Sequence, residues 1–246
     1  MISKLYWIGR KHFKASGGHE VKNKILIVAA HPDDEILGCG GTAARLTREK
    51  NEVSVAILGE GITSRDRERD GQGRKRDLLR LQKQAEQANR IIGVKDVFFF
   101  GLPDNRFDTL PLLDIIKTVE DVKKRIQPDI VYTHFSHDLN VDHRITFQAV
   151  LTAVRPVPGE CVKEMYSFEI LSSTEWNVHS PFVPDLFVDI RETIGIKLEA
   201  LQKYEDEVKN FPHPRSREGV ESIARCWGMK AGFEYAEAFK VIRILK

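Results

Sequence analysis

The sequence has few cysteines and no long apolar run. The three cysteines, Cys39, Cys161 and Cys226, are widely separated and form no Cys-x-x-Cys pair. This spacing argues against a disulfide framework and against a zinc site made of thiolates, and it is typical of a reducing compartment. No stretch approaches the roughly eighteen consecutive apolar residues of a membrane-spanning helix. We therefore expect a cytoplasmic protein without a transmembrane segment.

The sequence also lacks an excess of charge of either sign. Its 38 Lys and Arg residues nearly balance its 36 Asp and Glu residues, which leaves a net charge of +2. A chain with this balance has no overall field that would attract nucleic acid. No nucleic-acid partner is therefore expected.

No Pro-, Ser- or Gly-rich linker interrupts the 246 residues. This length suits one large α/β domain or two small ones, and without a linker we expect a single domain over residues 23–246. Residues 1–22 are predicted to be an N-terminal extension. Their basic and aromatic residues would suit a membrane surface, but we favour packing on the domain or on a neighbouring subunit of a homo-oligomer.

The apolar residues predict an alternation of strands and helices. Short apolar runs predict strands at 24–30, 52–58, 97–100, 129–133, 162–171, 185–190 and 238–245. Apolar residues at helical spacing predict helices at 37–50, 75–92, 110–126, 191–208 and 216–233, and a further helix ending at 154. The predicted fold is α/β: a Rossmann-like three-layer sandwich with a mostly parallel central sheet and helices on both faces.

A polar cluster follows the first predicted strand, where His31, Asp33, Asp34 and Glu35 surround a proline. Open α/β sheets bind ligands just beyond the carboxyl ends of their strands. Capping of the next helix would explain one carboxylate, but it would leave the imidazole and another acid without a role. A histidine and an aspartate are suitable ligands for a divalent metal such as zinc. The other aspartate would then be free to act as a base.

Glycines in the next helix are not interpreted as a nucleotide-binding loop. Gly38, Gly40 and Gly41 resemble such a loop only superficially, because a dinucleotide fingerprint needs glycine directly after the strand. This chain has His31 and Pro32 at those positions. We therefore do not expect a dinucleotide cofactor.

A second polar cluster, residues 134–144, follows the fourth predicted strand. It contains three histidines and two aspartates: His134, His137, Asp138, Asp142 and His143. Taken alone, Asp142 would be read as a helix cap and the histidines as exposed loop residues. Two such clusters at the ends of two strands of one sheet instead favour a shared site.

Other candidate residues have two interpretations each. Arg65 lies in the polar loop 59–73 and either reaches a substrate hydroxyl or carboxylate, or belongs to a solvated segment. Asp104, Asn105 and Arg106 are either turn residues or hydrogen-bonding groups for a polyol. His213, between two prolines, suits a rigid turn or a site. Trp176 suits sugar stacking or the core.

With both clusters, the chain resembles the PIG-L/LmbE family of zinc-dependent N-deacetylases. The family includes N-acetylglucosaminyl-phosphatidylinositol de-N-acetylase and the deacetylases of mycothiol and bacillithiol synthesis. The resemblance rests on Ala30-His-Pro-Asp-Asp-Glu35 and on Asp142-His143, and it runs from about residue 23 to the C-terminus. It implies that His31, Asp34 and His143 hold one zinc ion and that Asp33 is the general base. It also implies a small-molecule or glycan substrate that carries an N-acetyl group.

The sequence departs from the family pattern at one position. Many relatives have His-Pro-Asp-His where this chain has Asn140-Val-Asp-His143, so a histidine thought to polarise the carbonyl or stabilise the oxyanion is missing. Asn140 can still donate a hydrogen bond to the substrate, but it carries neither proton nor charge. His134, His137 or His213 would have to replace the histidine, and we favour His213. Asp142 is expected to orient an imidazole and to cap its helix.

The predicted reaction is hydrolysis of an acetamide on an N-acetylglucosamine-type sugar. Zinc-bound water, with a pKa near 7, would lose its proton to Asp33 and attack the carbonyl, which releases a free amine and acetate. Iron could replace zinc in such a ligand set. An amidase for a thiol conjugate and a non-catalytic sugar-binding module remain alternatives. A phosphoesterase is less consistent, because such enzymes typically use a two-metal carboxylate cage.

Overall fold

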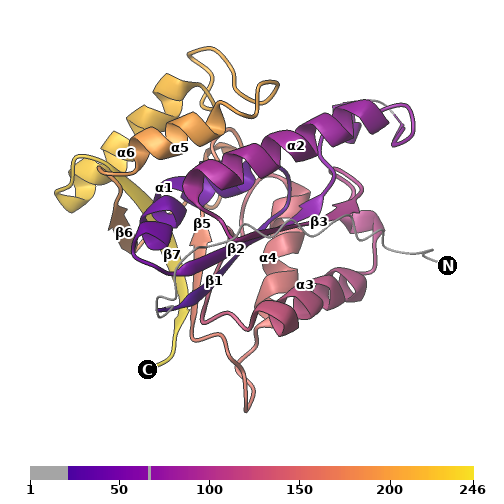
Figure 1. Ribbon diagram of the computed structural model, residues 1–246, viewed down its shortest axis with the longest axis horizontal. Helices are drawn as coiled ribbons and strands as arrows, with labels where there is room; N and C mark the ends of the chain where they lie inside the picture. The colour runs from indigo at the N-terminus through magenta and orange to yellow at the C-terminus, as the bar shows by residue number, and fades with distance from the viewer. Residues whose placement is uncertain (1–21, 66–67) are drawn as a thin grey trace.

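A single sheet of seven strands forms the centre of the molecule (Figure 1). The computed structural model describes residues 22–65 and 68–246. The strands are β1 (Lys24–Ala29), β2 (Glu52–Gly59), β3 (Asp96–Leu102), β4 (Ile130–His134), β5 (Glu164–Phe168), β6 (Leu186–Asp189) and β7 (Ala236–Ile244), in the order β3-β2-β1-β4-β5-β7-β6. The first five pair in parallel, and β7 is antiparallel to both β5 and β6. The predicted mostly parallel sheet is confirmed.

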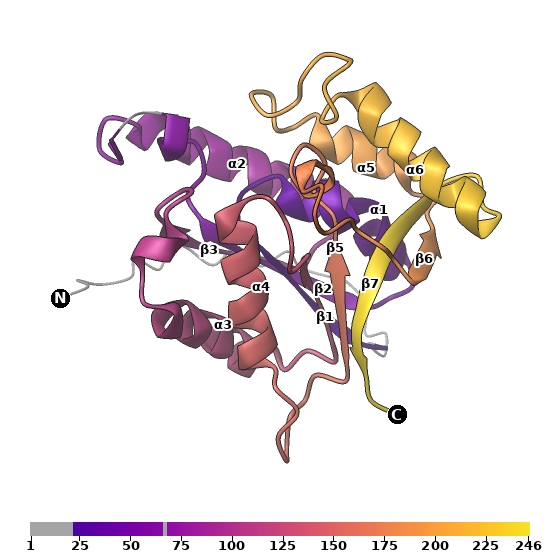
Figure 2. The same cartoon turned by 180° about the vertical axis from the view of Figure 1, so that it is seen from behind.

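Helices cover both faces of the sheet, as predicted. They are α1 (Asp34–Arg48), α2 (Lys75–Ile92), α3 (Leu112–Ile126), α4 (Val141–Ala153), α5 (Ile194–Leu201) and α6 (Arg217–Ala231). Figures 1 and 2 show α3 and α4 on one face and the other four on the opposite face. Alternate residues of β1 enter two separate cores: Ile25 and Ile27 pack on the α1 side, and Leu26 and Val28 on the α3 side. This explains why β1 reads as a continuous apolar run.

The order of the strands brings the two polar clusters together. From β1 the chain proceeds to β2 and β3 on one side, and later returns to β4 on the other side of β1. β1 and β4 are therefore neighbours, with Val28 opposite Thr133. Ligands bind at such a switch point, beyond the carboxyl ends of the strands. The clusters at 31–35 and 134–143 both begin there.

Helix α1 begins earlier than predicted and is interrupted. It begins at Asp34 rather than Leu37, so the glycines lie inside it, and Cys39 has the non-helical angles φ −148° and ψ 22°. A Cβ atom on Gly38 would lie 2.3 Å from Phe168 Cδ2, and one on Gly41 would lie 2.9 Å from Ile190 Cδ1. These glycines thus allow α1 to pack closely against its neighbours.

The C-terminal third differs most from the predicted elements. The helix predicted at 191–208 is only α5, Ile194–Leu201, and the strand predicted at 162–171 is only Glu164–Phe168. Tyr204 lies in the turns after α5 and is fully buried, with its hydroxyl donating to Glu35. Tyr204 continues the helical spacing of the apolar residues although it lies in a turn. The spacing therefore predicted a helix longer than the one observed.

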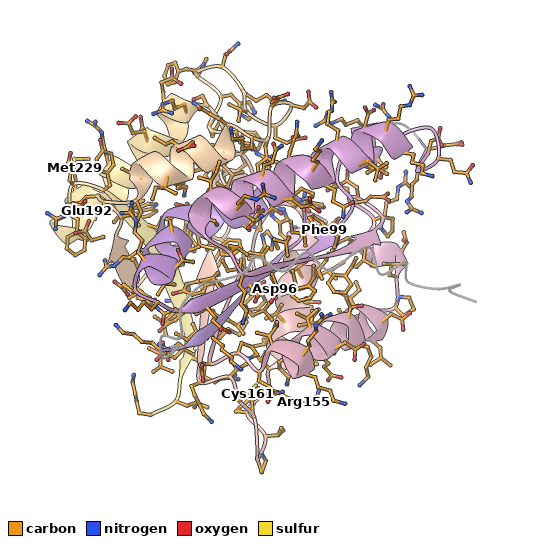
Figure 3. The ribbon with its side chains drawn as sticks, viewed as in Figure 1. Asp96, Phe99, Arg155, Cys161, Glu192 and Met229 are labelled. Carbon is orange, nitrogen blue, oxygen red and sulfur yellow. The ribbon has the colours of Figure 1, made fainter. Side chains whose placement is uncertain are left out.

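Strand β3 forms one edge of the sheet. Asp96 and Phe99 lie on it between α2 and α3 (Figure 3). A groove of about 820 Å³ runs along this edge, lined by side chains of all three elements, and shares Pro32 with the cavity described below. The predicted extension lies almost entirely outside the described residues, so the predicted domain boundary remains a prediction. No helix in residues 22–65 and 68–246 is long and apolar enough to cross a membrane.

Candidate metal centre

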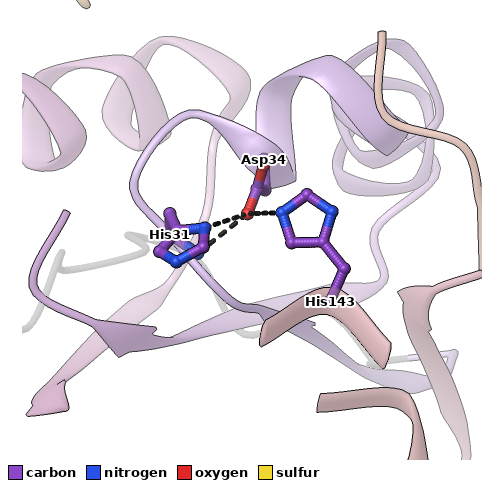
Figure 4. A group of neighbouring side chains, drawn as sticks. All are labelled: His31, Asp34 and His143. Atoms are coloured by element: carbon purple, nitrogen blue, oxygen red, sulfur yellow. Dashed lines mark hydrogen bonds and ion pairs between the residues drawn. The ribbon is translucent and has the colours of Figure 1, made fainter. Parts of the chain in front are cut away.

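The two polar clusters meet at Asp34 (Figure 4). His31 follows β1, Asp34 is the first residue of α1, and His143 lies in the first turn of α4. Asp34 Oδ2 lies 3.5 Å from His31 Nδ1 and 3.4 Å from His143 Nε2. The three residues each offer a ligand atom, all within 4.8 Å of one another. Residues more than a hundred positions apart thus form one compact group.

The spacing of these atoms suits a tetrahedral ion. Ligand atoms about 2.0 to 2.1 Å from zinc, at tetrahedral angles, lie roughly 3.4 Å from one another. The two distances from Asp34 Oδ2, 3.5 Å and 3.4 Å, are close to this value. Among the described residues, Asp34 Oδ1 is buried and has no hydrogen-bond partner. A cation at this position would compensate a carboxylate that is otherwise only partly satisfied.

Carboxylates hold both imidazoles from behind. His31 Nε2 lies 2.9 Å from Asp142 Oδ2 and His143 Nδ1 lies 3.1 Å from Asp138 Oδ1, so each ring directs its other nitrogen toward Asp34. Asp142 is itself fixed by the backbone N–H groups of Asn105 and Phe107, at 2.7 and 2.9 Å. Such carboxylate–histidine contacts set the tautomer and orientation of metal ligands.

Asp138 is anchored from a distant part of the chain. The hydroxyls of Ser173 and Thr174 both donate to its carboxylate. Together with His143, these hydrogen bonds lower the pKa of Asp138 to about 2 against the cost of burial. Asp138 therefore stays ionised while it holds His143.

The prediction that Asp142 caps α4 is wrong. Asn140 occupies the N-cap position, and its Oδ1 accepts from the N–H groups of Asp142 and His143 at 2.8 and 3.4 Å. Both residue types are good caps. Asp142 is instead directed toward His31, where its carboxylate accepts three hydrogen bonds.

Burial and charge oppose each other in this group. Burial alone would raise the pKa of Asp34, but the nearby His143 and His134 hold it well below its usual value. Burial would lower the pKa of His143, but Asp34 and Asp138 raise it to about 8. Burial likewise opposes the rise of the His31 pKa, which the hydrogen bond to Asp142 drives well above its usual value. The raised pKa values mean that His31 and His143 tend to be protonated, and their positive charge compensates the neighbouring carboxylates in the way a bound cation would.

His134 also approaches Asp34, with its Nε2 3.5 Å from Asp34 Oδ2, whereas His137 lies at the surface. His134 Nε2 accepts the N–H of Ala30 at 2.8 Å, and burial lowers the pKa of His134 to about 3. Its ring is therefore neutral, and the lone pair of Nε2 is used. His137 is exposed and bonds to Ser136 Oγ at 2.7 Å. Neither ring is placed to replace the missing histidine.

Asp33 lies beside the metal group on a turn with φ 102°. Its side chain is 3% exposed, and its Oδ2 accepts from Arg215 Nη1 at 2.9 Å. Burial raises the pKa of Asp33 well above its usual value, and Arg215 opposes this rise. The backbone N–H of Asp33 donates to Glu35 Oε2 at 3.1 Å.

These groups share a small polar cavity of about 130 Å³. Its lining residues are His31, Pro32, Asp33, Asp34, Gly61, Ile62, Ser64, Arg65, Leu81, Asp104, Asn105, Asn140, His143, Glu207 and Arg215. All of the predicted metal-binding and substrate-binding residues are among them. His213 is not, and its Nδ1 accepts the backbone N–H of Arg215 at 3.1 Å. The catalytic role of His213 remains a prediction.

The predicted substrate-binding residues line the cavity together with the candidate ligands. Asp104 Oδ2 accepts the N–H of Ser64 at 3.0 Å, and its Oδ1 lies 3.3 Å from His31 Nε2. Asn140 Nδ2 donates to Asn105 Oδ1 at 2.9 Å, while Arg65 pairs with Glu207. The sequence interpretation did not select Glu207 or Arg215. Arg215 lies two residues after His213, in the proline-bounded segment that was singled out only for its histidine.

Comparison with known proteins identifies relatives of this chain. It is 28% identical over 186 residues to an uncharacterized deacetylase, YaiS, of Escherichia coli, and this alignment covers 73% of the chain and 89% of that protein. It is 25% identical to the diacetylchitobiose deacetylase of Thermococcus kodakarensis, with coverage of 96% and 89%.

A solved structure and a family model complete the comparison. The 4-carboxy-2-hydroxymuconate hydratase of Pseudomonas putida has the same fold, with 22% identity, a TM-score of 0.72 and coverage of 91% of this chain and 98% of that one. The model of the GlcNAc-PI de-N-acetylase (PIG-L) family matches residues 26–154, which include both polar clusters. The chain therefore belongs to the PIG-L family.

Proposed function

We propose that this protein is a metal-dependent hydrolase that removes the N-acetyl group from an amino sugar of the N-acetylglucosamine type. The observation that carries the proposal is the placement of a buried carboxylate, Asp33, on the same cavity wall as the group formed by His31, Asp34 and His143. Family membership and relatives named as deacetylases support it. The substrate would be a small molecule or a glycan.

The donor set suits zinc. Two imidazole nitrogens and one carboxylate leave one position open in a tetrahedral site, and the buried Asp34 Oδ1 without a partner supports a cation there. Zinc held by His31, Asp34 and His143 would act as a Lewis acid and would lower the pKa of a water molecule to about 7. Iron would suit the same ligands.

The chain's own residues supply the remaining steps. Asp33 accepts the proton of the attacking water and returns a proton to the amine as it leaves, which yields a free amine and acetate. Asp138 and Asp142 keep the imidazoles in their orientation. Arg65, Asp104 and Asn140 line the cavity with groups that suit sugar hydroxyls.

The hydratase with the same fold shows why the reaction needs a direct test, since fold alone does not determine chemistry. We would load the protein with zinc and measure acetate and free amine from N-acetylglucosamine and from diacetylchitobiose. Equal amounts of both products are expected.

The matched variant is Asp33→Asn, which keeps the size of the side chain and one acceptor oxygen but is not a base. It should retain its metal and lose about two to four orders of magnitude in kcat, the usual scale of acid–base help. Near-normal turnover in this variant would exclude Asp33 as the base. Cleavage of a thiol-conjugate amide but of no N-acetyl sugar would favour the amidase, and sugar binding without hydrolysis would favour the binding module.

A further inference from the structure

We infer that Arg215 is the positioning residue for Asp33: its guanidinium fixes the carboxylate at the cavity wall and compensates its buried charge. This inference rests on the proposed function, in which Asp33 is the base.

The guanidinium of Arg215 is held rigidly. Its Nε donates to Ser172 Oγ at 2.8 Å and to the carbonyl of Leu171 at 3.3 Å, while Nη1 donates to Asp33 Oδ2 at 2.9 Å. The side chain is 20% exposed. A planar group fixed at two of its nitrogens has a single orientation. Arg215 thus connects the loop after β5 to the turn between β1 and α1.

The buried carboxylate of Asp33 needs a compensating charge. Its carboxylate is nearly fully buried, and a buried charge is costly unless it is paired and hydrogen-bonded. Among the described residues, Arg215 is the basic side chain that the structure places in contact with it. The guanidinium stays charged across the working pH range, unlike an imidazole.

Arg215 belongs to a chain of charges along the cavity. Glu207 Oε2 lies 4.0 Å from Arg215 Nη1, and Glu207 also pairs with Arg65. The order Arg65–Glu207–Arg215–Asp33 therefore alternates in sign from one side of the cavity to the other. His213 supports this arrangement from outside, because its Nδ1 accepts the backbone N–H of Arg215.

The test compares Arg215→Ala and Arg215→Lys with the control Arg217→Ala, an exposed arginine at the start of α6. Arg215→Ala should lower kcat by about 10²-fold, the scale of a small misplacement of a reacting group, with KM changed less than about twofold. Metal content should stay at the wild-type level. Arg215→Lys should recover part of the loss, and millimolar guanidinium should partly rescue Arg215→Ala but not Asp33→Asn.

A double-mutant cycle separates positioning from general support of the fold. Adding Arg215→Ala to Asp33→Asn should lower kcat no further, because a residue that acts through Asp33 loses its effect when the base is gone. Additive losses would overturn the inference. So would a loss that appears only in KM, or one that follows loss of metal.

Two further outcomes are distinguishable from each other. An inactive wild type counts against the proposed function, whereas an active wild type with an equally active Arg215→Ala counts against this inference alone. If Arg215→Ala does not fold, the kcat of Arg215→Lys tests the inference instead. Lysine lacks the planar fork, so full wild-type kcat in that variant would contradict the inference.

Discussion

At the scale of single residues, Asp34 connects the two parts of the candidate site. Its Oδ2 is 3.5 Å from His31, 3.5 Å from His134 and 3.4 Å from His143. Only His134 among these rings uses its facing nitrogen for a backbone hydrogen bond. The other two are free to share a cation with Asp34, which makes the ligand set His31, Asp34 and His143 chemically reasonable.

Glu169, which is neither a candidate ligand nor a cavity-lining residue, should make the stability of the protein depend on pH. Burial raises its pKa from 4.5 to about 7, although Trp227 Nε1 donates to its carboxylate. Between these values the folded protein holds a proton that the unfolded chain releases, so this contribution to stability falls as the pH rises from about 4.5 through 7. Glu169→Gln should remove the decline.

The measurement is chemical denaturation of both proteins at pH 5 and pH 8. The unfolding free energy of Glu169→Gln relative to the wild type should increase by roughly 2 to 3 kcal/mol between these pH values. A constant difference would show that Glu169 titrates normally in the folded state. Comparison of the two proteins cancels the titration of all other groups.

At the scale of elements, a buried ion pair spans the interruption of α1. Glu237 on β7 accepts the N–H groups of Gly41 and Thr42 at 2.9 and 2.6 Å. Lys197 on α5 donates to Glu237 Oε1 at 2.6 Å and to the carbonyl of Leu37 at 2.7 Å. The two side chains thus satisfy backbone groups that the non-helical residue leaves without helical partners.

Removing one charge of this pair should be costly. Glu237→Gln is expected to lower the free energy of unfolding by about 3 kcal/mol, because Lys197 would remain buried without its counter-charge. The control is Glu49→Gln at the C-cap of α1, whose exposed ion pair with Arg45 should contribute less than about 1 kcal/mol. Denaturant titration of both variants measures the difference. Equal effects would mean that the buried pair is no more important than a surface one.

Much of the fold was predictable at this scale, because β1, β2 and β4 have apolar runs with polar residues directly after them. The position of His31 and Asp34 follows from that pattern, and the sheet order brings β4 beside β1. The contacts that hold the site were not predictable. Asp138 depends on Ser173 and Thr174, which lie 35 and 36 residues away, and such pairings have no local sequence signal.

The same limit applies to Arg215. Its partner Asp33 is 182 residues away, and an arginine after a proline is usually a solvated surface residue. The assignment of the helix cap was wrong for a different reason: Asn140 and Asp142 are equally good caps by type. Asp142 contacts His31 in the folded structure, so Asn140 is left to cap the helix.

At the scale of the whole molecule, the candidate ligands follow two neighbouring strands, β1 and β4, that are far apart in the sequence. His31 and Asp34 follow β1, and His143 lies in the first turn of α4, after β4, so the complete set exists only when β1 and β4 are paired. A metal bound by all three would therefore bind the folded state far better than the unfolded chain. Its binding free energy would add to the stability of the fold.

Metal removal should consequently lower the melting temperature. With zinc at about a thousand times its dissociation constant the gain is about 4 kcal/mol, and a chelator should abolish it. His143→Ala should bind little metal and show no zinc-dependent shift, whereas His137→Ala, which changes an exposed ring, should behave like the wild type. Elemental analysis and thermal melts with and without chelator measure both effects. A full zinc complement in His143→Ala would exclude it as a ligand.

The left-handed backbone at Asp33 lowers the stability of the fold at the position of the proposed base. At φ 102° glycine is comfortable and a residue with a Cβ is not, so the position holds an acid where the main chain favours glycine. Asp33→Gly and Asp33→Ala remove the same carboxylate and should be equally inactive. The free energy of unfolding of Asp33→Gly, measured by denaturant titration, should nevertheless exceed that of Asp33→Ala by about 1 kcal/mol. This difference would measure the stability lost by having a residue with a Cβ atom at this position.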